Sequence, residues 1–133
     1  MFHFRKIFLL FFAFFSTLIS SAQTYNFRNY TVDDGLPFIQ VYTIFQDSKG
    51  YLWSGGYGGL SRFDGKTFVN YTPKNGLLNH WVTSITEDNS GKLFVGTIKG
   101  LTIIDRGKIT NYTTKEGLPG ERINVVYKDK SGK

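Results

Sequence analysis

The chain has 133 residues, no cysteine, fifteen glycines and a formal net charge of +6. The absence of cysteine excludes a disulfide scaffold, a cysteine-ligated metal site and a thiol nucleophile. The basic and acidic residues are scattered singly along the chain, whereas a nucleic-acid-binding surface would show clustered Lys and Arg. We therefore expect no nucleic-acid partner.

Residues 1–22 have the three-part pattern of an export signal. Two basic residues precede an apolar run from Ile7 to Ile19, and small residues stand directly before Gln23. A membrane-spanning helix needs about 20 apolar residues, and this run is shorter. The sequence predicts cleavage after Ala22 and an exported chain of residues 23–133. The alternative is that the segment is kept as a membrane anchor.

The predicted mature part is rich in glycine and aromatic residues. All fifteen glycines lie in it, together with six Phe, eight Tyr and two Trp. This composition argues against a helix bundle and favours short strands joined by tight turns.

A 41-residue repeat runs through this part of the chain. The pair Gly35-Leu36 recurs 41 residues later as Gly76-Leu77, and again as Gly117-Leu118. Residues 27–67 align with residues 68–108 without a gap and share fifteen identities in 41 positions. Missing such a period would misassign the whole fold, because repeats of this length build stacked or circular arrays.

Each unit predicts four short strands. In the first unit, β-branched and aromatic residues favour strands at 41–45, 51–55, 60–63 and 67–72. Turn signals separate these segments, among them Asp64-Gly65, which is typical of a hairpin. Four strands in about 41 residues is the period of a propeller blade.

The repeat resembles the two-component regulator propeller repeat, and the resemblance covers essentially the whole mature part. In the first unit it rests on Gly35-Leu36-Pro37, Val41, Ile44, Asp47, Gly50, Leu52-Trp53, Gly55, Gly59-Leu60 and Phe63-Asp64. In the second it rests on Gly76-Leu77, Val82, Ile85, Asp88, Gly91, Leu93 to Thr97, Gly100-Leu101 and Ile104-Asp105. In the third it rests on Gly117-Leu118-Pro119, Ile123, Val126, Asp129 and Gly132.

The resemblance implies a sensor. Such repeats form the periplasmic part of hybrid sensor histidine kinases, which bind oligosaccharides and commonly act as homodimers. It implies no catalysis by this chain and no cofactor. Two alternatives stay open: a propeller that binds other proteins, and a propeller carbohydrate-active enzyme without a kinase.

The number of units predicts an incomplete propeller. From Phe27 onward the chain holds about 2.6 units (27–67, 68–108 and a truncated 109–133), whereas closed propellers have about 4–8 blades. We expect an all-β fold of four-stranded antiparallel blades, with an opening strand at 27–32 and the first strand of a third blade. The remaining blades of a longer protein are the expected partners, because a blade cannot bury its faces alone.

Positions that recur in every unit are interpreted as scaffold. The recurrent aspartates are expected to form turns and not a carboxylate set, and the recurrent Asn-Tyr-Thr sequons are taken as incidental to a strand. The aromatic residues at the centre of the second strand are expected to pack between blades and not to stack on a ligand. These residues are Asp47, Asp88 and Asp129; Asn29, Asn70 and Asn111; and Trp53 and Phe94.

Positions that differ between units concentrate in two loops, one before the first strand and one between the second and third strands. In a four-stranded blade both loops emerge on the same face, which is expected of a binding face built on a fixed scaffold. Aromatic side chains there could stack on sugar rings, and polar ones could bind hydroxyls or a carboxylate. The candidate ligand-binding residues are Phe38, Gln40, Tyr57, Asn79, His80, Trp81, Lys99, Glu121 and Arg122.

No metal or catalytic centre is predicted at this face. His80 is the only histidine of the mature part, and one histidine cannot supply the ligand spacing of a metal site. Glycoside hydrolysis needs two carboxyl groups, and Glu121 is the only acidic residue in the variable loops.

We predict that the exported protein begins at Gln23. Intact-mass measurement of the protein recovered from the periplasm should show the loss of residues 1–22, because the small residues before Gln23 form the cleavage site. A mass that retains these residues would contradict cleavage and favour the anchor.

Overall fold

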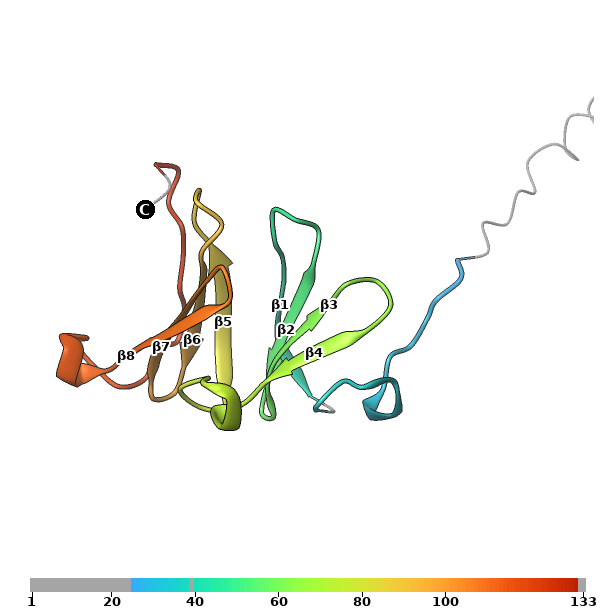
Figure 1. Ribbon diagram of the computed structural model, residues 1–133, viewed down its shortest axis with the longest axis horizontal. Coiled ribbons are helices and arrows are strands. Elements are labelled where there is room, and N and C mark those ends of the chain that lie inside the picture. The colour runs from blue at the N-terminus through green and yellow to red at the C-terminus, as the bar shows by residue number, and fades with distance from the viewer. Residues whose placement is uncertain (1–24, 39, 132–133) are drawn as a thin grey trace, which may run out of the picture.

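The structure is a computed structural model that describes residues 25–38 and 40–131, so the predicted export signal lies outside the described residues. The chain forms two four-stranded antiparallel sheets (Figure 1). The first contains β1 (Val41–Gln46), β2 (Leu52–Gly56), β3 (Gly59–Phe63) and β4 (Phe68–Tyr71). The second contains β5 (Val82–Glu87), β6 (Leu93–Thr97), β7 (Gly100–Asp105) and β8 (Lys108–Tyr112). The all-β fold with four-stranded blades is thus confirmed.

The two sheets repeat each other in register. Both are simple meanders in which sequence neighbours pair. Their first strands share an irregularity at the same repeat position, between Val41 and Thr43 in β1 and between Val82 and Ser84 in β5. The 41-residue period of the sequence is therefore also a period of backbone geometry.

The recurrent aspartates form turns, as predicted. Asp47 Oδ1 accepts hydrogen bonds from the backbone N–H groups of Lys49 (3.0 Å) and Tyr51 (2.9 Å). Asp88 Oδ1 does the same 41 residues later, with Ser90 (2.8 Å) and Lys92 (3.0 Å). Each carboxylate therefore accepts hydrogen bonds from backbone N–H groups of the turn that it begins.

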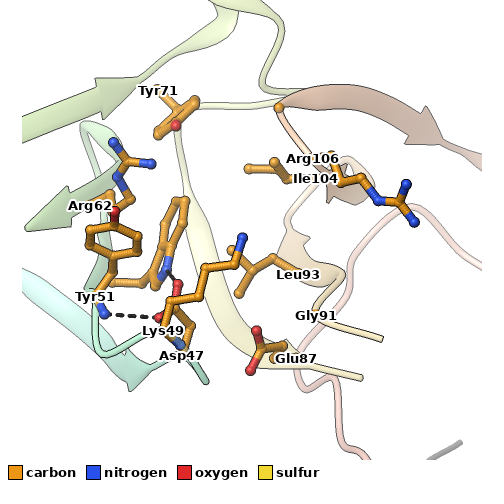
Figure 2. Close-up of a pocket in the computed structure, with 12 residues that line it drawn as sticks. Asp47, Lys49, Tyr51, Arg62, Tyr71, Glu87, Gly91, Leu93, Ile104 and Arg106 are labelled. Atoms are coloured by element: carbon orange, nitrogen blue, oxygen red, sulfur yellow. Dashed lines mark hydrogen bonds between the residues drawn. The ribbon is translucent and has the colours of Figure 1, made fainter. Parts of the chain in front are cut away.

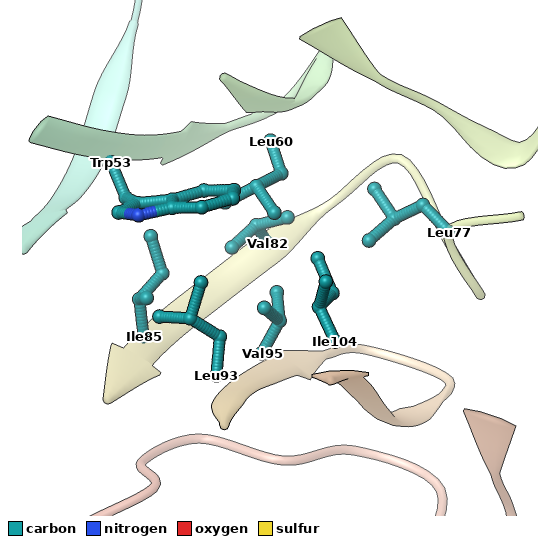
Figure 3. Close-up of a cluster of buried hydrophobic side chains, with 8 residues drawn as sticks. All are labelled: Trp53, Leu60, Leu77, Val82, Ile85, Leu93, Val95 and Ile104. Carbon is teal, nitrogen blue, oxygen red and sulfur yellow. The ribbon is translucent and has the colours of Figure 1, made fainter. Parts of the chain in front are cut away.

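The core lies between the two sheets and joins one blade to the next (Figure 3). Trp53 and Leu60 of the first sheet pack on residues of the second, and the Trp53 indole N–H donates to Asp47 Oδ2 at 2.8 Å. The second sheet and the loop before it contribute Leu77, Val82, Ile85, Leu93, Val95 and Ile104. Trp53 is thus a packing residue, as predicted.

Gly55 permits the close approach of β2 to β5. A Cβ at this position would lie 2.4 Å from Val82 Cγ1, a distance that real side chains do not tolerate. The missing side chain lets Val82 reach complete burial and fixes the spacing of the two blades near their inner strands.

The recurrent asparagines tie the outer strand to the loop that precedes the blade. Asn70 Nδ2 donates to the Gly35 carbonyl (2.9 Å), and Asn70 Oδ1 accepts from Ser61 Oγ (2.7 Å). Asn111 repeats both bonds with Gly76 (3.0 Å) and Thr102 (2.7 Å). Both ends of each amide are used, so the recurrent asparagine has a structural role in each described blade. We call each of these side chains an asparagine strap.

Two expected strands are not strands in the structure. Residues 25–31 and the third repeat beyond Gly117 carry no strand, because no neighbouring strand in the described part of the chain completes a ladder with them. The third repeat instead runs along the second blade, where the Ile123 N–H donates to the Thr97 carbonyl (2.9 Å) and the Val126 N–H to Ser84 Oγ (2.9 Å).

Three short 3₁₀ helices were not predicted from the sequence. They are η1 (Val32–Asp34), η2 (Pro73–Asn75) and η3 (Thr114–Glu116). Each lies directly before the loop that leads into the first strand position of a repeat. Three residues are too few to show helical periodicity. Within the described residues no helix is long and apolar enough to cross a membrane.

We predict unequal effects of one substitution made at two equivalent repeat positions. Ile85→Ala should lower the free energy of unfolding by about 2–4 kcal/mol because the Ile85 side chain is buried between blades. Ile44→Ala, 41 residues earlier on a face that leaves it 64% exposed, should cost about 0.5 kcal/mol or less. Urea denaturation of both variants checks this, and equal losses would contradict the assigned faces.

Candidate functional site

A repeated capping motif positions the loop before each blade. Thr31 and Thr113 accept hydrogen bonds from the first turn of η1 and η3, and their own N–H groups bond to Asp34 and Glu116. A glycine with positive φ ends each 3₁₀ helix: Gly35, Gly76 and Gly117, with φ of 101°, 107° and 103°. A residue with a side chain would be strained at this φ. The variable loop after each Gly-Leu pair therefore starts from the same backbone conformation in all three repeats.

The two variable loops of each described blade lie at one end of the sheets. Figure 1 shows η1, η2, η3 and the turns after β2 and β6 at the same end. The turns built on Asp47 and Asp88 lie at the opposite end. We call the first end the loop face and the second the turn face.

Phe38 is buried and supports the loop face from below. Its ring would lie 2.8 Å from a Cβ at Gly56 and 3.2 Å from one at Gly58, so the β2–β3 turn rests directly on it. The sequence predicts Phe38 as a candidate ligand contact. In the structure its side chain packs beneath the turn, and only 6% of its surface is exposed.

Aromatic side chains of two blades meet above that turn. The Tyr57 ring lies 5.0 Å from the Trp81 ring and 5.3 Å from the His80 ring, measured between centroids. Tyr42 lies nearly parallel to Trp81 at 6.3 Å. We call Tyr42, Tyr57, His80 and Trp81 the aromatic junction. Because Trp81 is half-buried among these rings whereas Tyr57 is 53% exposed, Tyr57 offers the more accessible stacking surface.

Two polar candidates shape this junction. Asn79 Oδ1 accepts from the Trp81 backbone N–H (2.9 Å), which fixes the start of the Trp81 loop. Gln40 Oε1 accepts from the Tyr42 hydroxyl (3.1 Å), which leaves the Gln40 amide group at the edge of the junction. Asn79 is therefore partly engaged in structure, and Gln40 keeps a donor for a ligand.

A second contact between loops is ionic. Lys99 Nζ lies 2.8 Å from Glu121 Oε2, and both side chains are more than half exposed. The hydrogen bond and the charge of Lys99 hold the pKa of the Glu121 carboxyl below its usual range. We call this pair the ionic junction. It joins the second blade to the third repeat through loops that are equivalent, 41 residues later, to those that build the aromatic junction between the first two blades.

Arg122 connects the two junctions. Its guanidinium carbon lies 5.9 Å from the centre of the Trp81 ring, within the range of cation–π attraction. Its Nε donates to Asn124 Oδ1 at 2.8 Å. The exposed cation therefore stands beside the aromatic surface, on the residue that follows Glu121 in the chain.

An open hollow adjoins the aromatic junction. It has a volume of about 550 Å³ and its lining is mainly apolar. The residues that line it are Val32, Pro37, Phe38, Gln40, Tyr57 and Gly58. An apolar lining with a few polar groups at its edge is the composition of sites that bind small organic molecules, although this hollow is shallow and open to solvent.

Sequence reasoning missed Tyr42, Val32 and Pro37. Tyr42 lies within a predicted strand, whereas the predicted candidates all stand in loops. Its repeat position is Tyr42, Thr83 and Asn124, so the same comparison extended into the first strand would have found it.

A smaller cavity of about 90 Å³ lies between the blades on the turn face (Figure 2). Trp53 and Leu93 line it together with Lys49, Glu87 and Arg62. Arg62 stacks over the Tyr51 ring at 4.6 Å. None of the sequence-predicted site residues lines this cavity, so we assign it to the contact between blades.

The comparisons with known proteins agree with the repeat architecture. Residues 35–58 and 76–99 match the family described as two component regulator propeller. Among curated proteins, no sequence matches at a significant level.

Two solved structures share the fold. One is the extracellular domain of a putative hybrid two component system from B. thetaiotaomicron (24% identity, TM-score 0.70, covering 79% of this chain and 15% of that chain). The other is the extracellular domain of a putative one component system from the same organism (25% identity, TM-score 0.62, covering 73% of this chain and 15% of that chain). The chain thus spans about 15% of the length of these domains.

We predict that the ionic junction depends on pH. Because the pKa of Glu121 is lowered in the folded protein, the link contributes stability above the ordinary carboxyl pKa and loses it as the pH falls through the lowered value. Lys99→Met should raise the Glu121 pKa towards its usual range, measured by NMR titration of the side-chain carboxyl. Lys49→Met, on the turn face, is the control and should leave the Glu121 pKa unchanged.

Proposed function

For a chain built from two-component regulator propeller repeats, we propose that it forms part of an extracytoplasmic sensor domain whose loop face binds a small-molecule or oligosaccharide ligand. The observation that carries this is the convergence of variable residues. Candidates from three successive repeats gather at the aromatic junction, at Arg122 and at the ionic junction. The opposite end is built from recurrent turns.

The chemistry of the loop face suits a sugar. Exposed Tyr57 offers an aromatic surface, and the neighbouring hollow gives it an apolar floor. Gln40 and His80 supply hydrogen-bonding groups at the edge, and Arg122 supplies a cation for a carboxylate. This combination of an aromatic platform with a few polar groups supports ligand binding.

The state of Glu121 disfavours a glycosidase. The general acid of such an enzyme needs a carboxyl group with a raised pKa and a second carboxyl nearby. The Glu121 pKa is lowered by its bond to Lys99, which is the opposite shift. A lowered pKa fits only the second, ionised carboxyl of such an enzyme, and the variable loops hold no other acidic residue to act as the acid, which supports a binding role for the loop face.

The proposed sensor includes further blades. Val41, Ile44 and Leu52 are 38%, 64% and 40% exposed, whereas their repeat equivalents Val82, Ile85 and Leu93 are 0%, 7% and 5% exposed. An apolar face that is buried in one blade and uncovered in the other is an interaction surface. In the proposal, another blade of a longer protein covers it.

The test is a glycan array probed with the exported protein and two tyrosine variants. Tyr57→Ala should weaken binding of any retained glycan by about tenfold, equivalent to about 1.4 kcal/mol. Tyr127→Ala is the matched control: Tyr127 is 78% exposed and precedes Lys128, whose side chain reaches the turn face. Equal binding by wild type and Tyr57→Ala would overturn the site, and binding of a protein but no glycan would favour an interaction module.

A further inference from the structure

One pair of repeat positions links neighbouring blades on the turn face. The first position precedes the turn aspartate and ends the inner strand in both described blades; it is occupied by Gln46, Glu87 and Lys128 at intervals of 41 residues. The second is the residue after the turn aspartate, occupied by Ser48, Asn89 and Lys130. In both described contacts the strand-end residue of one blade bonds to the turn residue of the blade before it.

At the first contact the strand-end residue is an acceptor. Glu87 receives hydrogen bonds from the Ser48 backbone N–H (2.8 Å) and from Ser48 Oγ (2.9 Å). Glu87 is only 7% exposed, and Figure 2 shows its carboxylate at the inter-blade cavity beside Lys49 and Asp47. A carboxylate buried to this extent is costly unless it is hydrogen-bonded, so Ser48 is the partner that permits it.

At the second contact the polarity is reversed. Lys128 Nζ donates to Asn89 Oδ1 at 3.3 Å. The two contacts join the same repeat positions, yet one uses an anion that accepts and the other a cation that donates. One apolar contact recurs in both places: a Cβ at Gly55 would meet Val82 and a Cβ at Gly96 would meet Ile123, so this contact does not distinguish one neighbour from another.

We propose that these two positions, which we name the blade clasp, select which blade packs against which. The side chains of Ser48 and Asn89 can each donate or accept, so the charge of the residue opposite sets the direction of the bond. A charged residue in the turn then fits an opposite charge at that position and repels a like charge. Discrimination by mismatched charge is an established route to pairing specificity. By the same rule the turn at Lys130 fits a neighbouring inner strand that ends in an acidic residue.

The rule can be tested within the chain by placing a lysine in each described turn. Lysine stands naturally at Lys130, so the turn geometry accepts it. Ser48→Lys puts the cation opposite Glu87 and should leave the urea midpoint of unfolding unchanged or raised. Asn89→Lys puts it opposite Lys128 and should shift the unfolding equilibrium constant about two- to fivefold towards the unfolded state, the range of solvent-accessible charge pairs.

The matched control combines Asn89→Lys with Lys128→Glu. This variant recreates a cation opposite a carboxylate and should recover the midpoint lost in Asn89→Lys. In about 1 M salt the difference between Ser48→Lys and Asn89→Lys should shrink, because screening acts within a few ångströms at that concentration. Asn89 is exposed and Lys128 is half-buried, so neither substitution removes a side chain from the core between the blades.

Equal midpoint shifts for Ser48→Lys and Asn89→Lys would overturn the proposal, as would failure of Lys128→Glu to restore the midpoint. Either result would mean that the two positions touch without discriminating between neighbours.

Discussion

The burial of one sheet face against the next is the interaction on which the other features depend. A four-stranded meander has two faces and cannot cover either by itself. Trp53 and Leu60 gain their burial only because Val82 and its neighbours lie opposite. The approach is close enough to require a glycine at position 55. Since the inner strands are held at this spacing, the loops at their ends are brought together at a fixed separation.

The bonds that fix the blades are separate from the side chains that vary in the loops, so the loops can differ while the blades remain alike. The asparagine straps and the threonine caps hold the start of the variable loop before the first strand with bonds that involve none of its variable side chains. Substitutions at His80 or Arg122 therefore change the loop face and leave these bonds in place. Sites that combine a rigid scaffold with adaptable loops are widespread for this reason.

Much of the fold could be predicted from the period of the sequence, and less of the site. Repetition located the strands and the aspartate turns, because both are set by local residue types. It could not show that residues 27–32 lack a strand, since a ladder requires a partner that local sequence does not specify. Comparison of repeats showed where variation lies but not where a side chain points: Phe38 is buried under a turn, Asn79 is engaged by a backbone N–H, and Tyr42 lies in a strand yet belongs to the aromatic junction.

The asparagine straps also bear on how the protein can be produced. Asn70 and Asn111 each stand in an Asn-Tyr-Thr sequence, the acceptor pattern for N-linked glycosylation in a eukaryotic secretory pathway. That modification attaches its glycan to Nδ2, the atom that donates to Gly35 or Gly76. A eukaryotic secretion host would therefore place a bulky sugar between the outer strand and the loop before folding is complete. The mass of its product would report how many of the three sequons, Asn29 included, had been modified, and peptide mapping would assign those at Asn70 and Asn111. A bacterial host without this pathway leaves both amides intact.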